Sequence, residues 1–106
     1  NISSVSRAGN IGQANYSAAK AAVAADTVVW ARELARYGIR VAAVAPGFIG
    51  TDMIASMKPE ALQRMTEVIP LKRLGKPQEV AHAIAFLLEN DYFTGRTLEL
   101  DGGVRL

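Results

Sequence analysis

The alternation of apolar and polar positions predicts one long helix near the start of the chain. Asn15–Tyr37 is rich in Ala and also carries Leu, Arg, Glu and Lys, which are good helix formers. Asn15 is a candidate N-cap, and Gly38 is a candidate for the residue that follows the C-terminus. Small and apolar residues cover much of this helix, so we expect it to pack on two sides. A partner subunit is one candidate for the second side.

Three short segments have the pattern of β-strands. Ile39–Ala45 is apolar nearly throughout, as expected for a strand buried on both faces of a parallel sheet, and Pro46-Gly47 ends it. Asn1–Val5 is interpreted as the end of a strand that enters a loop. Thr97–Leu100 is interpreted as the last strand.

Two further helices are expected between the second and third strands. Pro59 suits the first position of a helix that runs to about Val68, and Pro77 opens another that runs to about Leu88. The packing face expected for this last helix consists of Val80, Ala81, Ile84, Leu87 and Leu88. The order strand, helix, strand, helices, strand indicates an α/β fold with a parallel sheet. Three strands do not complete such a sheet, so we expect further strands from an absent N-terminal part or another chain.

Composition narrows the possible functions. The net charge of +2 gives no argument for a nucleic-acid or membrane partner. The chain has no cysteine and a single histidine, His82, so no metal site is expected, and His82 is interpreted as a surface or interface residue. The longest apolar run, Val41–Pro46, is far too short to span a membrane. The N-terminal residues include no initiator Met, basic stretch or apolar signal region, so we expect a soluble fragment or a sequence that begins within a protein. The lack of cysteine fits a reducing cytoplasm, which is the expected location.

Tyr16 and Lys20 form the candidate catalytic pair. They lie four residues apart at the start of the long helix and therefore share one face. An ammonium a few ångströms from a phenol favours the phenolate, which suits a tyrosine that exchanges protons. Ser4 lies just past a predicted strand end, where α/β sheets place their ligands. A tyrosine and a lysine four residues apart occur often by chance, and each candidate also has a purely structural interpretation. In that interpretation Tyr16 is a packing residue, Lys20 is solvated and Ser4 belongs to a turn.

The ordered set of motifs resembles the short-chain dehydrogenase/reductase family from the first residue to the last. The likeness is greatest to its 3-oxoacyl-acyl-carrier-protein reductases. The matching segments are NISS (1–4), YSAAK (16–20), GIRV (38–41), VAPGFIGTDM (44–53), RLGKPQEVA (73–81) and FTGRTLELDGG (93–103). The resemblance implies a Rossmann-like, doubly wound parallel sheet, with residues 1–106 as the C-terminal part of a single domain.

The resemblance implies a catalytic set of Ser4, Tyr16 and Lys20. Tyr16 is the general acid that protonates a carbonyl oxygen, or the base for the reverse reaction. Lys20 favours the phenolate and hydrogen-bonds the nicotinamide ribose, and Ser4 orients the substrate carbonyl. Ser4, Tyr16 and Gln13 are the expected substrate-binding residues, although Gln13 fits a purely structural loop role equally well.

The resemblance also implies a cofactor, NADP(H) or NAD(H), with NADP(H) favoured. The residues expected to bind it are Tyr16, Lys20, Pro46, Gly47, Ile49 and Thr51. Ile49 acts through its backbone, Thr51 lies near the carboxamide, and residues 51–68 form a mobile lid. The family's TGxxxGxG phosphate loop, the residue that separates NAD from NADP and the upstream active-site Asn are not in this sequence. We therefore expect residues 1–106 alone neither to bind the cofactor tightly nor to turn over.

The function expected from the resemblance is reduction of a small-molecule or carrier-linked carbonyl, such as a 3-oxoacyl thioester in fatty acid biosynthesis. The expected assembly is a homo-oligomer, either a dimer or a homotetramer, and Trp30 is interpreted as a core or interface residue. Tyr37 stands where carrier-protein reductases tend to have a basic residue, which weakens that assignment. Two alternatives remain: a family member acting on a sugar, steroid or small alcohol, and a catalytically silent fragment that serves as an oligomerisation module.

Overall fold

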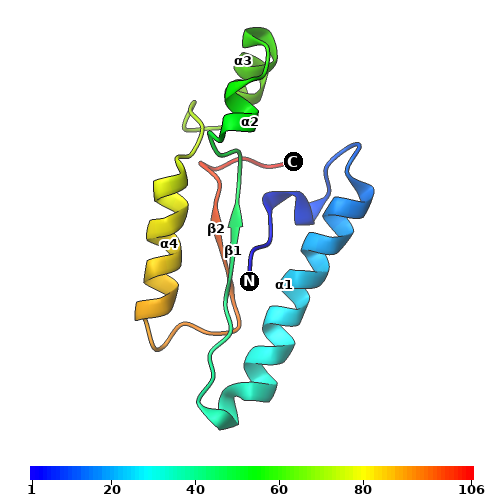
Figure 1. Ribbon diagram of the computed structural model, residues 1–106. Coiled ribbons are helices and arrows are strands. Elements are labelled where there is room, and N and C mark those ends of the chain that lie inside the picture. The colour runs from blue at the N-terminus through cyan, green and yellow to red at the C-terminus, as the bar shows by residue number, and fades with distance from the viewer.

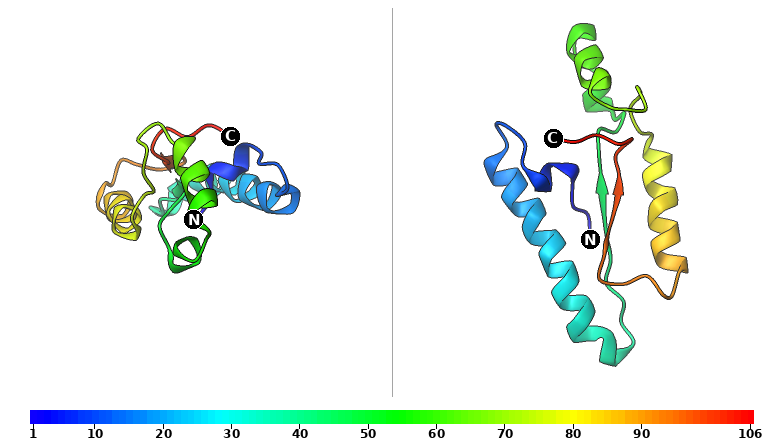
Figure 2. Two further views of the ribbon diagram at one scale, coloured as in Figure 1. Left: turned by 90° about the horizontal axis from the view of Figure 1, so that it is seen from above. Right: turned by 180° about the vertical axis from the view of Figure 1, so that it is seen from behind.

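The computed structural model describes residues 1–106 as a small α/β domain built around two parallel strands. One long helix lies on each face of the sheet, and two short helices form an arm beyond the carboxyl ends of the strands (Figure 1, Figure 2). The predicted α/β class is confirmed. With 3₁₀-helices labelled η, the elements in chain order are η1 (Val5–Ala8), α1 (Ala14–Leu34), η2 (Ala35–Tyr37), β1 (Ala43–Pro46), α2 (Asp52–Ala55), α3 (Pro59–Glu67), α4 (Pro77–Glu89) and β2 (Thr97–Leu100).

Strand β1 is the buried centre of the sheet. Residues 43–45 are at most 1% exposed, and the strand pairs in parallel with β2, with Val44 opposite Leu98. Val44 packs with Ala83 and Leu87 of α4 to form the hydrophobic core. Cover from a helix on either face explains why this strand carries no polar side chain.

The strand is shorter than the predicted span 39–45 and begins only at Ala43. The residues before it bond to the loop that leads into β2. The Val41 N–H donates to Thr94 Oγ1 (3.1 Å), and the Gly95 N–H donates to the Val41 carbonyl (2.7 Å). An apolar run predicts burial, but the position of its partner decides where the regular ladder starts.

The N-terminal segment pairs with the other edge of β1 through a single bridge between Ile2 and Val44. The Val44 N–H donates to the Asn1 carbonyl (3.0 Å), and the Ser3 N–H donates to the Val44 carbonyl (2.8 Å). The backbone groups of alternate residues in β1 point to the same edge of the strand. The Pro46 nitrogen therefore faces the N-terminal segment, as the Val44 N–H does, but it has no hydrogen to donate. The pairing therefore stops, and the chain leaves the sheet after Ser3 to enter η1.

Helix α1 begins at Ala14, ahead of the predicted cap at Asn15. The Gln13 carbonyl accepts the first helical hydrogen bond, from the Ser17 N–H (2.7 Å), so Gln13 is the N-cap. After α1 the η2 turn ends at Gly38, whose φ of 72° lies in the left-handed region, as predicted for this glycine. No helix of the chain combines the length and the apolarity that crossing a membrane requires.

The inner side of α1 carries small residues that pack closely on the sheet. Thr27 and Ala31 are buried, and Thr27 Oγ1 accepts a hydrogen bond from Asn1 Nδ2 (2.9 Å). On the outer side, Val29 and Trp30 are 49% and 43% exposed. Within this chain Trp30 is therefore not a core residue.

Helices α3 and α4 both start with a proline, Pro59 and Pro77, as predicted. The stripe of α4 that faces the sheet contains Val80, Ala83, Ile84 and Leu87. The predicted face was wrong in part, because Ala81 and Leu88 are exposed. Spacings of three, four and seven residues from Val80 lead to Ala83, Ile84 and Leu87, so Ala83 belongs to the packing face and Ala81 and Leu88 do not.

Arg40 secures the C-terminal end of α4. Its guanidinium donates to the carbonyls of Leu87 (2.8 Å), Leu88 (2.9 Å) and Phe93 (3.1 Å). The last carbonyls of a helix lack partners within the helix and carry partial negative charge, so a cation there is favourable. Arg40 thus joins the segment before β1 to the helix that covers the sheet.

Candidate active site

The residues singled out from the sequence lie at the end of the sheet where the parallel strands finish. The start of α1, the loop after β1 and the α2–α3 arm all meet there (Figure 1). Ligands of open α/β sheets bind in the crevice outside the carboxyl ends of the strands. This location makes the region the candidate active site.

Ser4 is buried at the point where the chain leaves the sheet. It is the N-cap of η1, and its Oγ accepts a hydrogen bond from the Ser6 N–H (3.1 Å). The hydroxyl hydrogen of Ser4 is committed to no acceptor in the structure. Ser4 can therefore donate to an added carbonyl oxygen without breaking a bond of the fold.

Tyr16 and Lys20 lie together on the first turns of α1, as their spacing predicts. Lys20 Nζ lies 5.6 Å from the centroid of the Tyr16 ring and donates to the Ile2 carbonyl (3.1 Å). The Tyr16 side chain is about half exposed, and its hydroxyl takes part in no hydrogen bond. An ammonium has three hydrogens, so Lys20 retains donors for a further acceptor.

Sequence reasoning missed the part that Ile2 and Ser3 play in this arrangement. Ser3 is 2% exposed, and its Oγ donates to the Lys20 carbonyl (2.7 Å). Lys20 is thus held at two atoms, its ammonium by Ile2 and its carbonyl by Ser3. These bonds fix the start of α1 against the segment that carries Ser4.

Gln13 is held within the loop that joins η1 to α1. Its Oε1 accepts from Ser6 Oγ (3.0 Å) and from Asn10 Nδ2 (2.9 Å). These bonds give Gln13 a structural role in shaping the loop. The residues from Gly12 to Tyr16 line an open hollow of about 510 Å³ beside it.

Four of the six residues expected to contact a cofactor lie at the end of β1 and in the loop that follows it. Pro46 ends the strand, and the Gly47 N–H donates to the Leu100 carbonyl (2.9 Å). Ile49 forms a backbone bridge with Gly75. Thr51 is exposed at the start of α2 and its side chain makes no capping bond.

These residues form two groups at one end of the sheet. Ser4, Tyr16 and Lys20 are joined through the N-terminal segment, whereas the loop after β1 is held by β2 and by Gly75. No hydrogen bond or ion pair links the two groups directly. The sheet itself sets their separation.

Comparison with known proteins gives the same family as the motifs. Residues 1–105 match the family model described as enoyl-(acyl carrier protein) reductase. The chain is 49% identical to the acetoacetyl-CoA reductase of Synechocystis over 105 residues, which cover 95% of this chain and 44% of that protein. It is 50% identical to the 3-oxoacyl-acyl-carrier-protein reductase of Thermotoga maritima over 98 residues, which cover 91% of this chain and 40% of that protein.

A solved structure agrees closely with the fold. The crystal structure of 3-hydroxyacyl-CoA dehydrogenase type-2 from Mycobacterium avium matches with a TM-score of 0.96 and 45% identity, over 99% of this chain and 42% of that one. The chain therefore belongs to the short-chain dehydrogenase/reductase family. It spans less than half the length of each of these relatives.

Proposed function

We propose that residues 1–106 supply the proton-transferring part of the active site of an NAD(P)(H)-dependent oxidoreductase. The observation that carries this proposal is the position of Lys20, whose ammonium is bonded to the Ile2 carbonyl and lies 5.6 Å from the centroid of the Tyr16 ring. The pair faces the end of the sheet where α/β folds bind ligands. On this proposal, residues 1–106 are the C-terminal part of one Rossmann-type domain.

The proposed reaction reduces a carbonyl to a hydroxyl. A bound nicotinamide dinucleotide supplies the hydride. Tyr16 donates its phenolic proton to the carbonyl oxygen, and Ser4 donates a hydrogen bond to the same oxygen as negative charge develops there. Lys20 stabilises the phenolate that remains on Tyr16 and uses its free N–H groups to hold the ribose.

The donor set fits such a dinucleotide. Thr51 has an exposed hydroxyl without a partner, and Lys20 has uncommitted N–H groups. We propose that Pro46, Gly47 and Ile49 line the nicotinamide side of the site, because their loop starts where β1 ends. The resemblance to the carrier-protein reductases favours NADP(H) over NAD(H).

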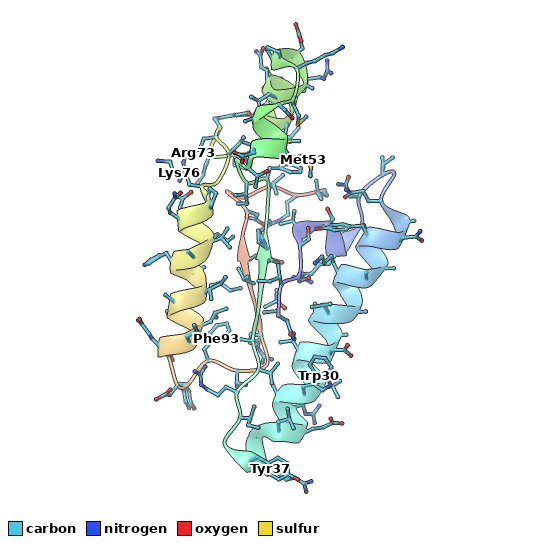
Figure 3. All side chains as sticks on the ribbon, viewed as in Figure 1. Trp30, Tyr37, Met53, Arg73, Lys76 and Phe93 are labelled. Atoms are coloured by element: carbon cyan, nitrogen blue, oxygen red, sulfur yellow. The ribbon has the colours of Figure 1, made fainter.

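We propose a 3-oxoacyl thioester as the substrate. The names of the Synechocystis, T. maritima and M. avium relatives all describe acyl thioesters with oxygen at carbon 3. The α2–α3 arm, proposed as the lid, presents Met53 with 82% of its surface exposed (Figure 3). Methionine is a flexible apolar residue that suits an acyl chain.

The test uses a chimera in which residues 1–106 replace the matching segment of the M. avium protein. We expect the chimera to reduce acetoacetyl-CoA with a reduced nicotinamide dinucleotide. Tyr16→Phe removes the proton donor, and a general acid typically contributes on the order of 100-fold to 10,000-fold to the rate. The Tyr37→Phe variant, which loses an exposed hydroxyl outside the site, is the matched control. Full activity of the Tyr16→Phe chimera, with its fold intact, would rule out the proposed mechanism.

We also propose that the protein works as a homo-oligomer with α1 at a subunit interface. Val28, Val29 and Trp30 are each at least 40% exposed around the outer side of this helix. Apolar side chains grouped on one exposed helix indicate an interaction surface.

A further inference from the structure

The two ends of the α2–α3 arm are joined at its base by backbone hydrogen bonds. The Gly75 N–H donates to the Phe48 carbonyl (2.9 Å), and the Gly50 N–H donates to the Gly75 carbonyl (2.8 Å). The chain therefore leaves the loop after β1, forms the arm and returns to the same place. Gly75 is the residue against which this loop is fixed.

Gly75 is packed closely against the loop after β1, and its backbone angle is ordinary. A Cβ atom at this position would lie 2.7 Å from Ile49 Cδ1, a distance at which one of the two groups has to move. The φ angle of Gly75 is not among the positive values in the chain. The backbone of residue 75 thus touches the side chain of the residue proposed to line the cofactor.

A bidentate ion pair holds the segment around Gly75. Arg73 Nη1 and Nη2 donate to the two carboxylate oxygens of Glu79, at 2.9 and 2.7 Å. The same carboxylate accepts from the Lys76 N–H (2.8 Å). Glu79 therefore binds the chain on both sides of Gly75. Arg73 and Lys76 lie beside the base of the arm at the start of α4 (Figure 3).

The carboxylate of Glu79 is charged at all physiological pH values. The hydrogen bonds from Arg73 lower the pKa of Glu79 to about 2, and the bond from the Lys76 backbone acts in the same direction. Glu79 belongs to α4, whose inner face packs on the sheet. The ion pair is thus anchored to the rigid part of the fold.

A hollow borders the loop on the side of Ile49. A hollow of about 140 Å³ lies between the loop, the returning end of the arm and the turn after β2, with Ile49, Leu71 and Asp101 in its wall. Packing behind Ile49 is therefore incomplete, and the loop is held here by the backbone bonds at Gly75, together with the bond from the Gly47 N–H to the Leu100 carbonyl.

We infer that Arg73 and Glu79 are positioning residues: by holding Gly75 against Ile49 they fix the loop 47–51, and so set the affinity for the dinucleotide. The effect on dinucleotide affinity rests on the proposed function, whereas the effect on the loop does not. Neither residue needs to touch the cofactor. Misplacement of a binding loop by about 1 Å can cost on the order of 100-fold in rate, so a restraint at this position is consequential.

The experiment compares Glu79→Gln, Arg73→Lys and Glu99→Gln in the chimera. Glu79→Gln keeps an acceptor for the Lys76 N–H but removes the charge that binds Arg73. Arg73→Lys keeps the charge but cannot make two parallel bonds. Glu99→Gln is the matched control, because Glu99 forms a similarly exposed ion pair with Arg7, and these two residues belong to β2 and η1 and not to the loop or the arm.

The readouts are amide hydrogen exchange at Gly50 and Gly75 without ligand, the dinucleotide Kd, and kcat at saturating dinucleotide. For Glu79→Gln we expect faster exchange at both amides, by on the order of tenfold, with a similar rise in Kd and a smaller change in kcat. Arg73→Lys should raise the exchange rates and Kd less than Glu79→Gln does, and Glu99→Gln should change neither quantity. If the ion pair were purely structural, its loss would lower the unfolding temperature without raising Kd more than it changes kcat.

Each outcome decides one of the two proposals. Unchanged exchange at Gly50 and Gly75 in Glu79→Gln overturns the inference, whatever the chimera catalyses. Faster exchange with an unchanged Kd also overturns it, because the loop would then be held without consequence for binding. If the unmodified chimera fails to bind the dinucleotide, the proposed function fails, and the exchange rates alone decide whether the pair fixes the loop.

Discussion

Lys20 Nζ donates to the carbonyl of Ile2, which lies eighteen positions earlier in the chain and in a different element. Without this bond the lysine side chain would populate many rotamers, and its ammonium would occupy many positions. The backbone carbonyl restricts that freedom before any ligand arrives. The pairing of the N-terminal segment with β1 therefore also determines where the ammonium lies relative to Tyr16.

Replacement of Lys20 should reduce activity far more than stability. Lys20→Met removes the charge near Tyr16 and the bond to Ile2, and loss of one such partly exposed bond costs about 1 kcal/mol in the free energy of unfolding. The rate of carbonyl reduction by the chimera should fall by on the order of 100-fold or more, because the phenolate is no longer stabilised. Steady-state kinetics and urea unfolding measure the two effects. Equal activity of Lys20→Met and the unmodified chimera would contradict the assigned role.

Replacement of Arg40 should lower the stability of the fold and should not affect the catalytic step. Arg40→Ala leaves three carbonyls at the end of α4 and in the following loop without their donor, which should cost about 2 kcal/mol in the free energy of unfolding. Arg36→Ala is the control, since Arg36 donates only to the exposed hydroxyl of Tyr37. Urea unfolding of both variants should separate them clearly. Equal stabilities would show that the carbonyls find water instead.

The ion pair at the base of the arm should make stability depend on pH in the acid range. The pKa of Glu79 is lowered from 4.5 to about 2, so the ionised form is the one that the fold favours. Its contribution to stability is complete above pH 4.5 and is lost as the pH falls towards 2. The difference in Tm between the unmodified chain and Glu79→Gln should therefore shrink across this interval. A difference independent of pH would mean that the carboxylate does not stabilise the fold through its charge.

Two glycines should respond differently to substitution by alanine. At Gly47 an added Cβ would lie 2.8 Å from Asp101 Cα, which belongs to the backbone and cannot turn aside. Gly47→Ala should therefore cost about 1–3 kcal/mol and shift the loop proposed to bind the cofactor. At Gly38 there is open space, and Gly38→Ala should cost only about 1 kcal/mol for its left-handed backbone. Thermal unfolding gives both costs, and a dinucleotide titration should detect the shift at Gly47 alone.

The exposed outer side of α1 should control assembly. Val29→Asp places a charge opposite the buried side of the helix, where Val29 is 49% exposed. If α1 lies at a subunit interface, this change should lower the oligomeric state, because a buried unpaired carboxylate is strongly unfavourable. Light scattering after size exclusion measures the mass of the chimera, and Val68→Asp, the same change at a 59% exposed valine after α3, is the control. The same mass for Val29→Asp and the unmodified chimera would exclude Val29 from the interface.

The sequence predicted what depends on periodicity and on local backbone preference. The Tyr16–Lys20 proximity follows from helical spacing, and Gly38, Pro59 and Pro77 mark helix ends because of their restricted or permissive backbone angles. Thr97–Leu100 was predicted with its observed bounds. These features need only residues close together in the chain.

The features that sequence reasoning missed depend on contacts between distant residues. The bond from Ser3 to the Lys20 carbonyl spans seventeen positions and leaves no repeating pattern. Gln13 replaces Asn15 as the cap because the Gln13 side chain is held by Ser6 in the preceding loop. Such side-chain bonds are set by the tertiary fold, so propensity alone cannot indicate them.

At Pro46 the N-terminal segment and β1 diverge. With an N–H at this position, the N-terminal segment and β1 could continue to pair. Ser4 would then be a strand residue, and the strand would fix the direction of its side chain. Because this hydrogen is missing, the two segments diverge after Ser3. The missing hydrogen at Pro46 thus helps to set where the segment that carries Ser4 turns away from the sheet.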